Sequence, residues 1–227
     1  MKPTTKVAET EAPDGAVFVL YHHDGKYFLY MDDRAIMSTS LTHSELLLAD
    51  IGCEFKPKRA NPRVLIGGLG LGFSLRRTLE LTGPRSEVVV AELLLEIERW
   101  NRELLGGLND DILVDPRTQI AHADVFDLIR RAADKGPKYD AILLDVDDGP
   151  SSLIQPQNIQ IYGQEGMGTL RNALTPGGRI AFWAAGVEPR LLKAINRAGY
   201  RSEVIECAKH PRAKRKDHRI YLAERRD

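Results

Sequence analysis

Residues 63–72, which read RVLIGGLGLG, decide the fold of this chain. A short apolar run typical of a buried strand leads into glycines, and residues 71–83 then read as a helix with apolar side chains at Leu71, Leu75 and Leu79. Glycines between a strand and a helix let the backbone approach a ligand closely, and the first helical turn offers free N–H groups. The pattern predicts a nucleoside-cofactor loop with Gly67, Gly68, Gly70 and Gly72 as its binding residues. The structural alternative is a loop whose glycines serve only tight strand–helix packing.

The sequence after this loop alternates apolar runs with amphipathic helical segments. We expect strands at 87–92, 118–124, 139–145, 179–185, 201–208 and 218–224, and helices at 93–107, 125–134, 166–178 and 189–200. Strands that are apolar on both faces and separated by helices are typical of a doubly wound parallel sheet. The predicted fold class is therefore α/β and Rossmann-like.

The first sixty residues have a different character. Residues 1–14 are polar and are predicted to be a flexible tail, whereas 16–31 form two β-rich runs around the Asp24-Gly25 turn signal. A third strand at 35–40 precedes a helix that Thr42 and Glu45 are predicted to start as a capping box. We place a small unit of β-meander plus helix at 15–60 and the Rossmann-like domain at 61–227, with the alternative that the first unit packs directly onto the second.

Composition narrows the class of protein. The 227 residues hold 32 Lys and Arg against 32 Asp and Glu, and this neutral balance argues against a dedicated nucleic-acid binder. A local basic run at 209–219 is predicted to be a solvated hairpin loop, the alternative being a nucleic-acid or phosphate contact.

No apolar run has the length of a membrane span and the first residues lack the apolar core of a signal peptide, so we predict a cytoplasmic protein with no membrane partner. The six histidines and two cysteines show no metal-binding spacing, and we expect no metal.

Acidic residues follow three of the predicted strands. In a parallel sheet the ligand crevice lies at the carboxyl ends of the strands. Glu92 ends the second strand about 20 residues after the glycines, where a carboxylate can take both ribose hydroxyls. Asp124 ends the third strand and either accepts a hydrogen bond from an adenine amino group or caps the following helix.

The fourth strand ends in the acidic segment DVDDGP, at residues 145–150. Clustered carboxylates repel one another, and an amine substrate or a proton relieves that repulsion. Asp145, Asp147 and Asp148 are therefore predicted to bind an amine, and one of them to act as general base. The alternative is a solvated turn in which Asp147 and Asp148 cap the next helix.

These motifs together resemble the spermidine synthase family of polyamine aminopropyltransferases, whose fold is that of class I S-adenosylmethionine-dependent methyltransferases. The resemblance spans about residues 16–224: VLIGGLGLG resembles the family's GGGDGG loop, and AEL its VEID segment. DVDDGP is similar to the D-S-S-D-P segment, and IYGQEGMGTLRNALTPGG to the segment further on. The resemblance implies that Glu92 binds the ribose, that Asp145 is the general base and that the protein is a homodimer. It also implies that Asp147, Asp148, Glu45 and Tyr162 face a small amine substrate, Tyr162 with the alternative of a core position.

Departures from the family bear on the substrate. The aspartate of the family's glycine loop is met by Gly70 or Leu71, a glutamine by Met37, and of the YHE segment only Glu45 persists. We therefore predict a transferase that moves an aminopropyl group from decarboxylated S-adenosylmethionine to a polyamine or another amine. The alternatives are an S-adenosylmethionine-dependent methyltransferase acting on a small molecule, although Ile66 stands where such enzymes usually carry an acid, and a non-catalytic binding module.

Overall fold

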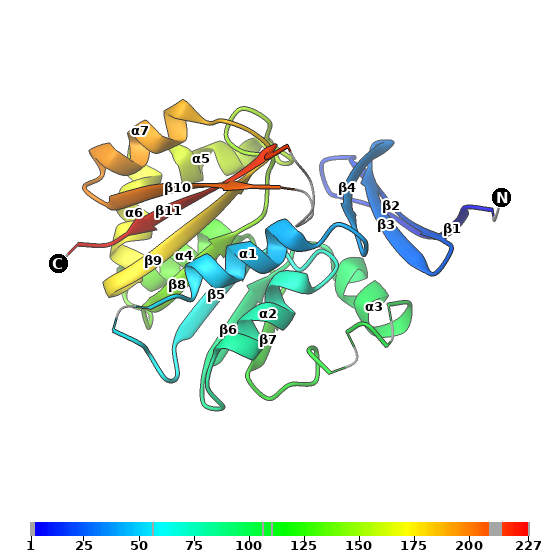
Figure 1. Cartoon of the computed structure of the whole chain (residues 1–227), viewed down its shortest axis with the longest axis horizontal. Helices are drawn as coiled ribbons and strands as arrows, with labels where there is room; N and C mark the ends of the chain where they lie inside the picture. The colour runs from blue at the N-terminus through cyan, green and yellow to red at the C-terminus, as the bar shows by residue number, and fades with distance from the viewer. Residues whose placement is uncertain (1–2, 56, 106, 110, 209–214, 227) are drawn as a thin grey trace.

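The structure is a computed structural model that describes residues 3–55, 57–105, 107–109, 111–208 and 215–226. Most of the basic run at 209–219 thus lies outside the described residues. The chain forms a four-stranded antiparallel sheet and a seven-stranded sheet. Figure 1 places the smaller sheet at one end of the molecule, beyond α1 and α3.

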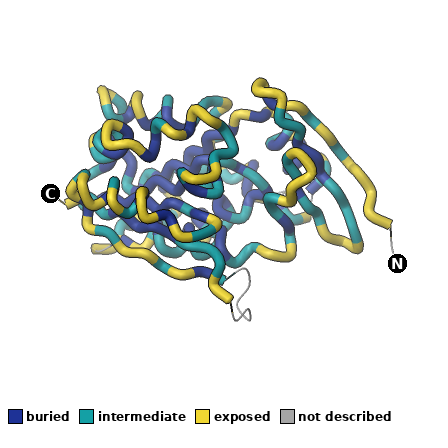
Figure 2. Tube along the Cα trace, turned by 90° about the horizontal axis from the view of Figure 1, so that it is seen from above, coloured by how far each residue is buried: buried dark blue, intermediate teal, exposed yellow. Residues whose placement is uncertain are grey.

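The smaller sheet has the order β1-β2-β3-β4, with strands Thr5–Glu11, Val17–His23, Lys26–Met31 and Arg34–Ser38. The first of these strands lies where we predicted a flexible tail, and that prediction is wrong for residues 5–11. β1 pairs with β2 from Thr5↔His22 to Glu11↔Val17. An edge strand is stabilised by backbone pairing on one side and needs no apolar run, so its polar sequence concealed it. Figure 2 shows the exposed positions along this strand.

The larger sheet has the order β10-β11-β9-β8-β5-β6-β7. Its strands are β5 (Arg63–Gly67), β6 (Glu87–Ala91), β7 (Thr118–Ala121), β8 (Tyr139–Leu144), β9 (Leu174–Ala184), β10 (Arg201–Cys207) and β11 (His218–Glu224). The five neighbouring strands β9, β8, β5, β6 and β7 are parallel to one another. β11 lies between β9 and β10 and runs antiparallel to both. The chain leaves β5 toward β6 and β7 and later returns on the other side of β5 as β8, which creates the topological switch point where ligands bind in such sheets.

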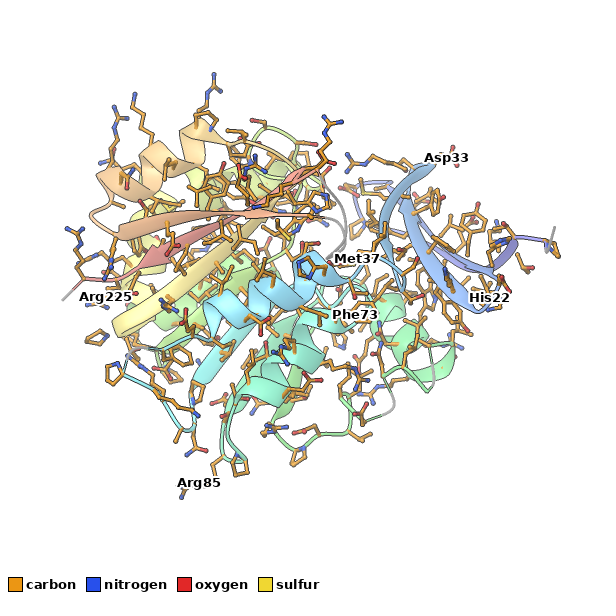
Figure 3. The ribbon with its side chains drawn as sticks, in the orientation of Figure 1. His22, Asp33, Met37, Phe73, Arg85 and Arg225 are labelled. Carbon is orange, nitrogen blue, oxygen red and sulfur yellow. The ribbon has the colours of Figure 1, made fainter. Side chains whose placement is uncertain are left out.

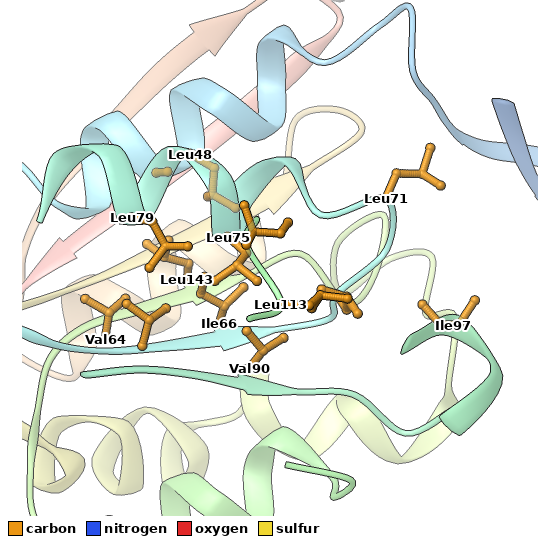
Figure 4. Packing of buried hydrophobic residues seen from close by; sticks show 14 of the residues in the cluster. Leu48, Val64, Ile66, Leu71, Leu75, Leu79, Val90, Ile97, Leu113 and Leu143 are labelled. Carbon is orange, nitrogen blue, oxygen red and sulfur yellow. The ribbon is translucent and has the colours of Figure 1, made fainter. Parts of the chain in front are cut away.

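Alternate residues of each central strand face opposite cores. Ile66 and Leu143 belong to the core beneath α1 (His43–Gly52) and α2 (Phe73–Leu81), and Figure 4 shows Leu48, Leu75 and Leu79 of those helices packed in this cluster. Leu65, Ile142 and their neighbours belong to the opposite core. Its helices are α4 (Val125–Asp134), α5 (Ile159–Tyr162), α6 (Gln164–Ala173) and α7 (Pro189–Arg197). Helix α3 (Leu95–Glu103) follows β6.

Helix α1 packs against α2, β8 and β9, so it covers the larger sheet although we had grouped it with the meander. The predicted capping box is also wrong: Thr42 makes no side-chain capping bond, and Glu45 instead accepts a hydrogen bond from Ser44 Oγ at 2.6 Å. Glu45 lies in the first turn of α1, but its side chain is 6% exposed and lines the cleft.

The segment from 145 to 163 contains only a 3₁₀ turn (Pro156–Asn158) and the four-residue α5. Sequence patterns predicted no element here because these residues have neither helical nor strand periodicity. Side-chain contacts of Asp147 with Tyr162 and of Asp148 with Arg34 hold this segment beside the switch point.

Candidate active site

A cleft opens at the carboxyl ends of β5, β6 and β8, beneath the smaller sheet. The Rossmann-like body contributes the glycine loop and acidic residues, while the smaller sheet contributes apolar side chains. The residues lining it include Phe18, Leu29, Ile36, Met37, Glu45, Gly68, Gly70, Phe73, Glu92, Asp124, Asp145, Asp147, Asp148 and Trp183. The strand ends that the sequence predicted to meet are thus brought together.

Gly68 and Gly70 form the backbone wall of the cleft, both with positive φ, +86° and +50°. A Cβ on Gly68 would lie 3.0 Å from the Asp145 carbonyl oxygen, so this loop can approach β8 only without a side chain. Gly67 and Gly72 are not among the described residues that line the cleft. A Cβ on Gly67 would contact Val146, and Gly72 is the N-cap of α2, so these two glycines serve packing and the helix start.

Two buried asparagines hold the glycine loop from behind. Asn101 Nδ2 donates to the Gly70 carbonyl at 2.8 Å, and Asn109 Nδ2 donates to the Leu71 carbonyl at 2.9 Å and to Asn101 Oδ1 at 2.6 Å. Both side chains are at most 1% exposed. Sequence reasoning missed them, because an asparagine in a helix and another in a loop carry no pattern that links them to a glycine loop. The only signal is an amide at an otherwise apolar helix position.

We expect Asn109→Ala to lower the free energy of unfolding by about 2 kcal/mol, because it leaves the buried Leu71 carbonyl without its donor. Thermal unfolding measures this as a fall in melting temperature of roughly 4 to 8 °C. Exposed Asn196 provides the control, since Asn196→Ala should change stability by less than about 0.5 kcal/mol. Equal effects of the two variants would contradict a supporting role for Asn109.

Glu92 follows β6 and is 9% exposed. Its Oε2 accepts from Leu69 N–H at 3.0 Å and its Oε1 from Leu94 N–H at 2.9 Å. Burial raises the pKa of this carboxyl, and backbone N–H groups partly oppose that rise. The backbone N–H groups that oppose the rise belong to residues 69, 70, 93 and 94, so this carboxylate holds the glycine loop at the end of β6.

Asp124 combines both roles that the sequence left open. Its carboxylate accepts from Phe126 N–H at 2.7 Å as N-cap of α4, and it also lines the cleft.

Asp145, which directly follows β8, and Glu45 of α1 both line the cleft. Burial raises the pKa of Asp145 to about 8, with further contributions from the negative charges of Glu45 and Asp148. Burial also raises the pKa of Glu45. A carboxyl group with such a pKa exchanges protons near neutral pH, which suits a general base.

Asp147 is 2% exposed, and both of its carboxylate oxygens accept hydrogen bonds. It accepts from Ile154 N–H at 2.7 Å, Asn158 Nδ2 at 3.1 Å and the Tyr162 hydroxyl at 2.9 Å, and burial raises its pKa to about 6. Tyr162 is not among the described residues that line the cleft. Asp147 lines the cleft and forms with Tyr162 a buried network that fixes the segment after β8, and contact of either residue with a substrate stays a prediction.

Asp148 pairs with Arg34 of β4, with Nη1 and Oδ2 2.7 Å apart. Next to it, Glu188 accepts from Ser151 Oγ at 2.7 Å and so holds the same segment against the start of α7. The Arg34–Asp148 ion pair ties the smaller sheet to the rim of the cleft.

Within the described ranges, no group of three or more His, Cys, Asp or Glu side chains is arranged to hold a metal ion. The helices of those ranges are also too short or too polar to span a membrane.

The topology and the cleft define a class I methyltransferase-like fold with a small N-terminal antiparallel sheet, as predicted. The spermidine synthase of Thermotoga maritima superposes with a TM-score of 0.71 at 16% identity, covering 96% of this chain and 72% of that one. A spermidine synthase in complex with the transition-state analogue AdoDATO gives a TM-score of 0.70 at 16% identity, with the same coverage of both chains. Human methyltransferase-like protein 13 in complex with SAH gives 0.57 at 20% identity, covering 82% of this chain and 80% of that one.

Sequence comparison confirms the resemblance to polyamine aminopropyltransferases. Polyamine aminopropyltransferase 1 of Streptomyces coelicolor is 34% identical over 145 residues, which cover 60% of this chain and 26% of that protein. Polyamine aminopropyltransferase 1 of Hyperthermus butylicus is 33% identical over 121 residues, or 52% of this chain and 39% of that protein. The chain thus spans between about a quarter and two fifths of these relatives. No family model matches the sequence.

Proposed function

We propose that this protein is an aminopropyltransferase that uses decarboxylated S-adenosylmethionine as donor and an amine as acceptor. One observation carries the proposal: six carboxyl groups line the cleft, and none of the described lining residues is Lys, Arg or His. A sulfonium donor that bears an ammonium group, together with an amine acceptor, suits such a negative cleft. The names of the sequence relatives support the same activity.

In the proposed reaction, the adenosine lies along the glycine loop with its ribose hydroxyls on Glu92. The acceptor nitrogen attacks the carbon of the aminopropyl chain that is bonded to sulfur, so an N–C bond forms as the bond between that carbon and sulfur breaks. The electron pair of the C–S bond neutralises the sulfonium, and methylthioadenosine leaves. Asp145 takes the proton from the attacking nitrogen. Orientation supplies most of the rate gain, because the sulfonium is already an activated leaving group.

Methyl transfer from intact S-adenosylmethionine is the second candidate. It is favoured because Gly70 or Leu71 stands where the resembling family has an acid that would repel a methionine carboxylate. The carboxylate-rich cleft weighs against it, because that carboxylate would find no cationic partner among the described lining residues.

Calorimetric titration with decarboxylated S-adenosylmethionine, S-adenosylmethionine and methylthioadenosine separates the candidates. We expect the decarboxylated donor to bind at least about tenfold more tightly than the intact one, since a buried unpaired carboxylate costs more than 1.4 kcal/mol. Tighter binding of S-adenosylmethionine would favour methyl transfer, and binding of none of the three would contradict both candidates. Homodimerisation stays a prediction, which sedimentation of the purified protein tests.

A further inference from the structure

A second pocket, here called the α7 pocket, lies between α7 and the segment that joins α5 to α6. Its described lining consists of Tyr162, Gly163, Gln164, Arg190, Lys193, Ala194 and Arg197. None of these residues is acidic, whereas six carboxyl groups line the cleft. The α7 pocket has a volume of about 330 Å³, which is within the range of small-molecule sites. The two pockets therefore suit ligands of opposite charge.

Three cations of α7 line this pocket without an acidic partner. Arg190, Lys193 and Arg197 are spaced by three and four positions, so they lie on one face of the helix. Their side chains take part in no hydrogen bond or ion pair with any other described residue, and α7 itself contains no Asp or Glu. Like charges at these spacings repel one another and destabilise a helix. An anion in the pocket would remove this repulsion.

Arginines on other helices of the chain have acidic partners about one turn away. Arg77 of α2 pairs with Glu80 at 2.8 Å, and Arg130 of α4 pairs with Asp127 at 2.5 Å. Two arginines of α3 are paired in the same way. The unpaired cations of α7 thus differ from the charged surface that these helices present to solvent.

The walls of the α7 pocket are anchored in the protein. Leu191 and Ile195 are at most 1% exposed and fix α7 against the core. On the other side, Tyr162 is 8% exposed, and its hydroxyl donates to Asp147 at 2.9 Å. Between the cations stands Ala194, whose side chain is too small to fill the pocket. The cations are therefore carried by a fixed helix around an open space.

We propose that the α7 pocket binds a phosphate chain, which is two or three linked phosphate groups, either free or attached to a nucleoside. Guanidinium groups match phosphate oxygens through paired hydrogen bonds, and a lysine ammonium adds a point charge. Arg190 and Arg197 are seven residues apart, or about 10 Å along the helix axis. A single phosphate group is shorter than this span, whereas a chain of three follows it past Lys193.

Calorimetric titration of the whole chain with inorganic triphosphate, in the absence of metal ions, tests this site. The cleft does not compete for the probe, because its carboxyl groups repel polyanions. We expect triphosphate to bind at least about tenfold more tightly than inorganic phosphate, which contacts fewer of the cations. Equal affinities, or no binding of triphosphate at millimolar concentration, would overturn the proposal. Neither donor nor acceptor is present, so the result is independent of the proposed function.

Arg190→Gln and Arg197→Gln are each expected to weaken triphosphate binding by about tenfold, since each removes a charge-assisted contact. Arg85→Gln is the matched control: Arg85 is also exposed, Figure 3 shows it far from α7, and its replacement should leave the affinity unchanged. All three side chains are exposed, so the variants should keep the melting temperature of the wild type within about 2 °C. Unchanged affinity in both α7 variants, or an equal loss in Arg85→Gln, would show that general surface charge holds the probe and would overturn the proposal.

Uridine triphosphate distinguishes the two sources of the phosphate chain. Affinity equal to or above that of inorganic triphosphate assigns the site to a nucleotide, and lower affinity assigns it to the free chain. Both results support the proposal if Arg190→Gln weakens the binding of both probes. Binding of uridine triphosphate that Arg190→Gln leaves unchanged would place the nucleotide elsewhere and contradict a nucleotide site on α7.

Discussion

Asp145→Asn is expected to lower the rate of methylthioadenosine release by about 10²- to 10⁴-fold while making the protein more stable. The rate falls because the amide cannot take a proton from the attacking nitrogen. Stability rises because the folded protein holds this carboxyl group with a pKa of about 8, whereas the unfolded chain ionises it near its ordinary value of about 4.

The pH dependence of this stability gain has a definite sign. Between pH 4 and pH 8 the folded state binds more protons at Asp145 than the unfolded state, so this group makes the wild-type protein less stable as pH rises. We expect the Asn variant to match the wild type near pH 4 and to exceed it at pH 8 by about 3 kcal/mol, or roughly 6 to 12 °C in melting temperature. The gain stays at about 3 kcal/mol because Asp145 is partly exposed, and solvent screens its ionised form.

Thermal unfolding of the wild type, Asp145→Asn and the control Asp134→Asn at both pH values measures this effect. Asp134 is an exposed aspartate at the end of α4, so its replacement should leave the pH dependence unchanged. If the Asp145 variant lost stability at pH 8, the carboxylate would be serving a structural contact, and its assignment as general base would fail.

Glu92→Gln is expected to weaken methylthioadenosine binding by roughly 30-fold, equivalent to about 2 kcal/mol, through the loss of charge-assisted bonds to the ribose. Because Glu92 also accepts Leu69 and Leu94 N–H groups, a loss of affinity alone does not separate ribose contact from loop support.

A 2′-deoxy analogue of methylthioadenosine separates these two roles by calorimetry. The wild type should lose affinity when the hydroxyl is removed, whereas the Gln variant should bind both nucleosides with nearly equal affinity. Exposed Glu103 on α3 provides the control variant Glu103→Gln, which should discriminate as the wild type does. Equal sensitivity of Glu92→Gln and the wild type to the 2′-hydroxyl would show that the ribose lies elsewhere.

The amino-acid sequence by itself determined the α/β class, the glycine loop and the positions of Glu92 and Asp145. These features are local: the periodicity of a strand or helix is written in a few consecutive residues, and a residue that ends a parallel strand necessarily lies at the crevice edge of the sheet. The same reasoning failed for β1, whose polar edge strand is defined only by its pairing with β2.

Only the tertiary structure decided which acidic residues are available to a ligand. The segment DVDDGP presents three equivalent aspartates in the sequence, yet Tyr162 and Asn158 engage Asp147, and Arg34 engages Asp148. Glu45 comes from a helix far away in the chain and is placed beside Asp145 by the packing of α1 on the larger sheet. These pairings depend on side chains that meet only after the two sheets pack together, and no local pattern encodes such distant contacts.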